Sequence, residues 1–143
     1  MLKVFERLTH PQPATVTLSL SFDSRQKSRF CTQLADGTAA LLDLPRGYIL
    51  RGGDCLKAED GRIILVQAAL ETVTHVQIVD PLLLARICYH LGNRHIALQI
   101  DAQWVRYQPD HVLDEMLQHF GLSISTLDAP FEPEGGAYQH VHA

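Results

Sequence analysis

Residues 73–100, VTHVQIVDPLLLARICYHLGNRHIALQI, decide the fold, because the period of their apolar positions changes twice. Residues 73–79 read as a strand with Val76 and Ile78 on one face and His75 on the other. Residues 81–91 repeat with helical spacing, and residues 96–100 return to a strand pattern. The stretch therefore predicts a strand, a helix and a second strand in that order.

The ends of this helix are marked by its flanking residues. Asp80 and Pro81 supply an N-cap and a proline at the first helical position. Gly92 follows the last apolar position, so we expect a left-handed glycine to end the helix there. His90 then lies in the last turn, and His95 lies beyond the helix. On one continuous helix five positions correspond to about 500° of rotation, so these two histidines do not form a chelating pair.

The pattern continues downstream with two more strands and a second helix. Residues 104–108 and 122–127 read as strands, and Asp110 caps a helix between them that Gly121 ends. The apolar stripe expected on this helix comprises Val112, Leu113, Met116, Leu117 and Phe120. The order strand, helix, strand, strand, helix, strand predicts a ferredoxin-like domain, a four-stranded antiparallel sheet covered by two helices.

The first 70 residues predict a different module. Residues 15–22, TVTLSLSF, alternate like a strand, and Asp-Gly pairs at 36–37 and 60–61 separate further strand-like runs. We therefore expect an all-β module of short antiparallel strands. The predicted organisation is an α+β chain with a β-rich N-terminal domain at 1–71, a ferredoxin-like domain at 72–132 and a short flexible tail at 133–143 that bears histidines.

Composition narrows the class of function. The formal net charge is −4, with 46% hydrophobic and 20% charged residues, which argues against nucleic-acid binding and predicts a globular protein. The N-terminus lacks the apolar core of a signal peptide and no apolar run is long enough to span a bilayer, so we expect a cytoplasmic protein with no membrane contact. The three cysteines show neither a disulfide framework nor a CxxC motif, and we expect buried thiols.

Four of the eight histidines are candidate metal ligands. His95 lies at a helix-to-strand corner and can give an ion one nitrogen. His111 follows the N-cap Asp110, where the helix dipole disfavours a protonated imidazole. His140 and His142 are one residue apart, so in an extended tail their rings can share an ion. Imidazoles without a thiolate cluster suit nickel, copper or zinc, and the spacing does not choose among them. For the other four histidines, His10, His75, His90 and His119, we expect ordinary loop, sheet or helix-end positions rather than metal binding.

Four motifs in one order resemble the urease accessory protein E (UreE) family of nickel metallochaperones. They are GDCL at 53–56, HLGNRH at 90–95, DHVLDEML at 110–117 and PFEPEGGAY at 130–138, and they span most of the chain. The resemblance implies a β-rich domain that holds a protein partner and a ferredoxin-like domain that dimerises and binds metal.

Site residues and partners follow from the same resemblance. His95 matches a histidine that shares Ni²⁺ with its symmetry mate at a homodimer interface, and His111 matches a peripheral ligand of some relatives. Pro109 stands where those relatives can carry another histidine. The implied function is delivery of nickel to the urease apoprotein maturation complex through the accessory GTPase UreG, with Zn²⁺ or Cu²⁺ as other ions that the site accepts.

Two other classes of function stay open at this point. One is a small ferredoxin-like hydrolase of the acyl-phosphate type that uses Arg94 and Asn93, and the other is a metal-independent protein-interaction module. The chain contains no nucleophile elbow, no P-loop and no HExxH motif, so we do not expect an enzyme.

Overall fold

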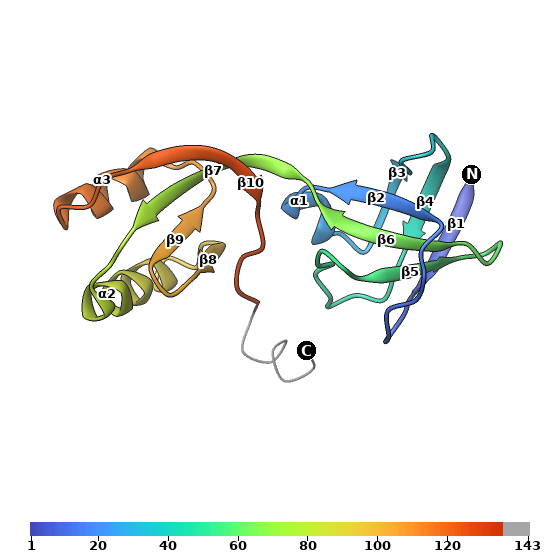
Figure 1. The fold of residues 1–143 in the computed structure, drawn as a ribbon, viewed down its shortest axis with the longest axis horizontal. Coiled ribbons are helices and arrows are strands. Elements are labelled where there is room, and N and C mark those ends of the chain that lie inside the picture. The colour runs from blue at the N-terminus through green and yellow to red at the C-terminus, as the bar shows by residue number, and fades with distance from the viewer. Residues whose placement is uncertain (136–143) are drawn as a thin grey trace. The chain divides into compact units, whose positions relative to one another are not determined.

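A computed structural model describes residues 1–135 of the 143-residue chain (Figure 1). The chain forms two compact units, Met1–Ala69 and a second unit that begins at Leu70. The first is rich in strands and the second combines a sheet with two helices, so the predicted two-domain α+β class is confirmed.

The first unit is built on a six-stranded sheet with the order β2-β6-β5-β1-β4-β3 (Figure 1). Alternate residues of its strands are buried, and nine of them, which include Val4, Leu18, Leu42 and Leu56, form one apolar core together with Leu34, Leu44 and Leu50. The elements are β1 (Leu2–Arg7), β2 (Val16–Leu20), α1 (Phe22–Arg25), β3 (Arg29–Gln33), β4 (Ala39–Asp43), β5 (Cys55–Ala58) and β6 (Ile63–Ala68).

Both predicted hairpins are present in this sheet. Asp36–Gly37 connects the antiparallel pair β3 and β4, and Asp60–Gly61 connects β5 and β6. Each glycine has φ of 90°, a left-handed conformation that glycine adopts without steric penalty. The aspartates accept backbone hydrogen bonds from Thr38 and Arg62, which lowers the pKa of each carboxyl group.

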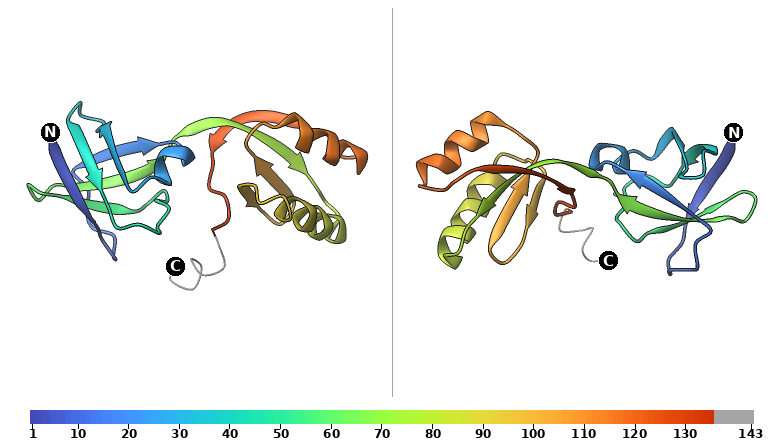
Figure 2. Two further views of the ribbon diagram at one scale, coloured as in Figure 1. Left: turned by 180° about the vertical axis from the view of Figure 1, so that it is seen from behind. Right: turned by 45° about the horizontal axis from the view of Figure 1, so that its top comes forward.

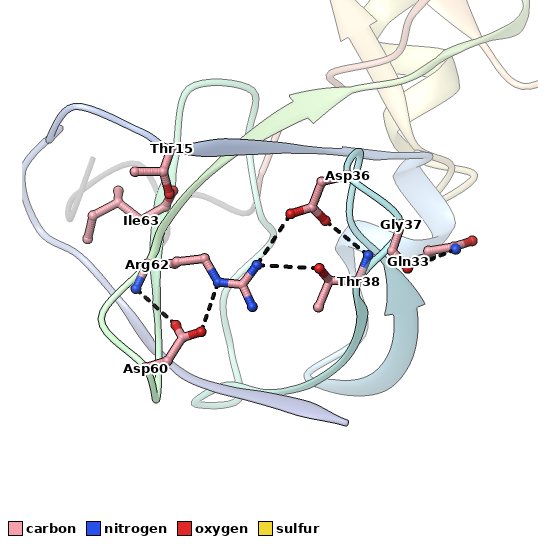
Figure 3. Close-up of polar contacts among 8 residues, drawn as sticks. All are labelled: Thr15, Gln33, Asp36, Gly37, Thr38, Asp60, Arg62 and Ile63. Carbon is pink, nitrogen blue, oxygen red and sulfur yellow. Dashed lines mark hydrogen bonds and ion pairs between the residues drawn. The ribbon is translucent and has the colours of Figure 1, made fainter.

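The Arg62 side chain joins the two turns (Figure 3). Its Nε donates to Asp60 Oδ2 at 2.8 Å, and its Nη1 donates to Asp36 Oδ2 at 3.3 Å. The same Nη1 also donates to the Thr38 hydroxyl at 3.3 Å. One guanidinium therefore bridges hairpins that are more than 20 residues apart in the sequence.

The prediction of an all-β module of short antiparallel strands is wrong for two strand pairs and for the short helix α1. Strands β1 and β4 are parallel, and so are β2 and β6. Alternation specifies which residues are buried but not the direction of the partner strand, so the sequence pattern could not distinguish these pairings. The strand expected to reach Phe22 ends at Leu20, because the Ser21 hydroxyl accepts a hydrogen bond from Ser24 N and starts α1.

In the second unit the element order is β7-α2-β8-β9-α3-β10, and the four strands form one sheet with the order β10-β7-β9-β8. Every pairing is antiparallel. Both helices contribute to one core with the sheet, through Ile87 and Leu91 of α2 and Leu113 and Leu117 of α3 (Figure 2). The elements are β7 (Leu70–Gln77), α2 (Pro81–Gly92), β8 (Leu98–Ile100), β9 (Trp104–Tyr107), α3 (His111–His119) and β10 (Ser125–Pro130).

Two residues of the predicted α3 stripe lie outside this core. Val112 is 44% exposed and Phe120 is 38% exposed, whereas Leu113 and Leu117 are buried as expected. Val112 lies in the first turn of the nine-residue helix, and Phe120 lies just beyond its last residue, His119.

The start of the expected flexible tail is attached to the sheet. Pro133 is buried, and Glu134 N donates to the Leu98 carbonyl oxygen at 2.8 Å. Just before it, Glu132 N donates to Gln99 Oε1. The backbone from 132 to 134 therefore runs along β8. The sequence of this segment has no periodicity, so its pattern did not predict the contact. Residues 136–143 lie outside the described part of the chain.

The three cysteines differ in burial. Cys55 is buried, but Cys31 is exposed and Cys88 is only partly buried, so the prediction of three buried thiols is wrong for Cys31. Burial and the nearby Glu134 carboxylate raise the pKa of the Cys88 thiol. Among residues 1–135, no helix is long and apolar enough to cross a membrane.

Candidate metal centre

His95 lies in the turn that follows α2. The helix ends at Gly92, and the next three residues fold back on it: Asn93 N donates to the Tyr89 carbonyl, Arg94 N to Leu91 and His95 N to Gly92. The last two of these bonds span three residues, the tighter spacing common at helix ends. The left-handed residue expected at Gly92 is instead His95, whose φ is 56°.

This conformation is uncommon for a residue with a Cβ atom. The left-handed region costs an ordinary L-residue about 1–2 kcal/mol, although histidine occupies it more often than most. Such strain persists only where the surrounding structure holds the backbone, and it is frequent at ligand sites. Here Leu91 and Leu98, both buried, hold the chain on either side of the turn. An exposed imidazole thus sits on a firmly held corner.

His111 is the first residue of α3 and is also exposed. The Asp110 carboxylate accepts hydrogen bonds from Val112 N at 2.9 Å and Leu113 N at 3.3 Å, which confirms the predicted N-cap. The backbone at His111 is therefore well defined.

A second interaction that the sequence analysis missed fixes this helix end to the sheet. The Tyr107 hydroxyl of β9 donates to Asp114 Oδ1 of α3 at 2.6 Å. Tyr107 is fully buried, and burial together with the Asp114 carboxylate raises the pKa of its phenol. The two residues are seven apart in a strand-to-helix connection, a spacing that carries no motif, so only the structure reveals the pair.

Two other histidines contact neighbouring side chains, and a third is exposed. His75 accepts a hydrogen bond at Nδ1 from Arg106 Nε, and its Nε2 lies 3.2 Å from Gln77 Oε1, so both ring nitrogens are engaged within the sheet. The His90 ring contacts Tyr89 and Phe120, with centroids 5.5 and 5.6 Å apart. His119 is exposed in the last turn of α3.

Within residues 1–135, no group of three or more histidine, cysteine, aspartate or glutamate side chains is close enough together to hold an ion. His95 lies three residues beyond the end of α2, His111 begins α3, and both are exposed. His140 and His142 lie outside the described residues. Asn93 and Arg94, the residues of the hydrolase alternative, are exposed in the same turn as His95.

The fold and these side chains define a two-unit α+β protein that exposes histidine side chains on its surface. Two family models match it: the N-terminal domain of the UreE urease accessory protein at residues 3–69, and the C-terminal domain of the same protein at residues 71–143. The chain belongs to the UreE family of urease accessory proteins.

Curated relatives carry the same assignment across nearly the whole chain. The urease accessory protein UreE of Alkalilimnicola ehrlichii is 54% identical over 138 residues, which covers 96% of this chain and 85% of the relative. The UreE of an Enterobacter species is 52% identical over 139 residues, covering 96% and 91%. That of Pseudomonas putida strain GB-1 is 50% identical over 142 residues, covering 97% and 86%.

Proposed function

We propose that this chain is a homodimeric nickel chaperone in which the His95 side chains of two copies share one Ni²⁺. The observation that carries the proposal is the exposed imidazole on a left-handed, firmly held corner. A side chain held in this way loses little further freedom when it binds an ion, and such pre-organisation strengthens binding. Membership of a urease accessory family supports nickel as the cargo.

A second copy supplies what one copy lacks. A two-fold axis doubles every ligand near it, so one histidine per chain is enough to begin a site. Helix α2, which leads into the His95 turn, also exposes apolar side chains: Leu82 is 59% exposed and Tyr89 is 67% exposed. A partner that covers this surface would bury apolar area along α2. The ferredoxin-like arrangement of the second unit is part of this proposal, and the shared core of α2, α3 and the sheet supports it.

The choice of metal and the destination rest on chemistry and family together. Neutral imidazoles bind nickel, copper and zinc, so selectivity depends on geometry and supply, and Zn²⁺ or Cu²⁺ also fit the site. The cargo passes to the urease maturation machinery, through the accessory GTPase UreG to the urease apoprotein. The chain acts by binding and transfer rather than by catalysis, in the cytoplasm.

His111, His140 and His142 are proposed as weaker ligands. His111 is exposed at the start of α3, and Pro109 occupies the position two residues before it. His140 and His142 lie outside the described residues, so their part in binding rests on the sequence alone. We therefore assign the tightest site to His95.

Calorimetric titration with Ni²⁺ tests the assignment. His95→Ala should lose the tightest nickel of each dimer while sedimentation still shows a dimer. His10→Ala, which removes an exposed histidine of the first unit, is the matched control and should bind like the parent. Deletion of residues 139–143 should reduce stoichiometry but keep the tight site. If the deletion abolishes tight binding and His95→Ala does not, the tail holds the primary ligands and the proposal is wrong.

A further inference from the structure

The first unit contains a pocket of about 180 Å³ that metal binding does not use. Its lining comes from three places in the chain: Arg7 at the end of β1, residues 27–28 before β3, and the loop from 44 to 50 after β4. Leu44 and Leu50, both buried, form an apolar part of the lining. Tyr48, which is 49% exposed, adds an aromatic wall.

The buried side chain of Arg25 holds this pocket in shape. Its Nε donates to the Leu20 carbonyl at 3.2 Å and its Nη1 to the Leu50 carbonyl at 3.1 Å. Leu50 N donates in return to the Arg25 carbonyl, and Leu44 N donates to the Ser28 carbonyl. Both ends of the 44–50 loop are therefore fixed, so a ligand would meet a preformed site and order little on binding.

The charge of the pocket is opposite to that of the whole chain. Arg7 and Lys27 both line it and no acidic side chain does, although the formal net charge of the chain is −4. The Arg7 guanidinium lies over the Tyr48 ring, 4.3 Å from its centroid. Its Nη1 forms an ion pair with Asp54, 3.9 Å from Oδ1, a distance too long for a hydrogen bond. Stacking uses the flat face of the guanidinium and leaves donors on its edge for an anionic ligand.

Size limits the ligand further. Pockets for small molecules and cofactors typically measure about 300–1,000 Å³, so this one accommodates a single side chain rather than a cofactor. The Ser28 and Thr9 hydroxyls supply further hydrogen-bonding groups in the lining. The pocket therefore combines two cations, two hydroxyls and an apolar surface in the space of one residue.

We propose that this pocket binds an acidic side chain from a peptide segment of a protein partner, with the hydrocarbon stem of that same residue against Leu44 and Leu50. The carboxylate is held by Arg7 and Lys27. The apolar surface favours an acid carried on a hydrocarbon stem over inorganic phosphate or nucleic-acid phosphate, which bring no apolar group to cover it. This role is separate from nickel binding.

The test is a titration of the ¹⁵N-labelled full chain followed by NMR, with a chelator present so that metal plays no part. The probes are acetyl-Leu-Glu-amide and its neutral match acetyl-Leu-Gln-amide. The glutamate peptide should move the amide signals of Ser28, Leu44 and Leu50 and saturate. The glutamine peptide should bind more weakly by roughly 3- to 10-fold, because it loses a charge-assisted contact.

Two variants check that the pocket itself is responsible. Lys27→Gln should weaken the glutamate peptide, whereas Lys57→Gln, which removes the same charge from an exposed position on β5, should not. Equal binding of the two peptides, or equal weakening by the two variants, would overturn the proposal. So would tighter binding of acetyl-leucine through its terminal carboxylate, or competition by inorganic phosphate at equal concentration, because each would identify a different ligand.

Discussion

His95→Gly should make the metal-free protein more stable than His95→Ala, although both variants remove the same ligand. The φ of 56° at this position places a Cβ atom in the left-handed region, where an L-residue is about 1–2 kcal/mol less favourable than glycine. Part of this advantage of the glycine variant is lost, because glycine has more conformational freedom in the unfolded chain, which costs about 0.4–1 kcal/mol of stability. The net difference expected in the free energy of unfolding is therefore about 1 kcal/mol in favour of glycine.

Urea unfolding measured by tryptophan fluorescence gives the comparison directly. Trp104 is the single tryptophan and lies in β9, so its emission reports on the unit that contains the turn. With a slope of about 1–2 kcal/mol per molar urea, the midpoint of His95→Gly should exceed that of His95→Ala by roughly 0.5–1 M. Protein concentration is kept equal, because dimerisation makes stability depend on it. A glycine variant as stable as the alanine variant, or less so, would show that His95 is not strained and would remove the main observation behind the metal site.

Three further perturbations follow from the contacts described above. Tyr107→Phe removes the 2.6 Å hydrogen bond to Asp114, so the free energy of unfolding should fall by about 1–3 kcal/mol. The same urea assay measures it, and an unchanged midpoint would show that the pair does not anchor α3. Asp36 and Asp60 have pKa values below the usual 3.8, so they stabilise the folded state above that pH and the contribution is lost as the pH falls through their lower folded values. Replacing both by asparagine should flatten the acid unfolding curve of the first unit, followed by its amide signals, and an unaltered curve would count against this origin. Nickel held by neutral imidazoles should be released as the pH falls below about 6.5, and the affinity for the metal moves the pH of release further down. Equilibrium dialysis that finds full nickel occupancy at pH 4 would indicate other ligands.

Local signals in the sequence predicted much of the second unit correctly. Asp80 and Asp110 cap α2 and α3 as expected, because an N-cap depends on a side chain and on backbone groups two or three residues away. The buried positions Ile87, Leu91 and Leu113 likewise follow from helical periodicity alone.

Features that depend on distant parts of the chain were not predictable in this way. The parallel pairing of β1 with β4 joins segments about 40 residues apart, and nothing in either strand specifies that direction. The contact of Glu134 with Leu98 is equally remote. At the candidate site, the sequence identified His95 but assigned its backbone conformation to Gly92, because glycine is the usual left-handed residue after a helix. A tight turn of three residues follows the helix, so the left-handed conformation falls at His95 rather than at Gly92.

Sharing of one nickel ion by two His95 side chains is the central claim, and native mass spectrometry of mixed dimers tests it most directly. Unlabelled parent protein is exchanged with ¹⁵N-labelled His95→Ala, so that both homodimers and the heterodimer appear as separate masses in one spectrum. At limiting Ni²⁺ the parent homodimer should carry one ion, and the heterodimer should be as empty as the His95→Ala homodimer, because a single imidazole cannot complete a shared site. A heterodimer that retains nickel as tightly as the parent dimer would contradict the account.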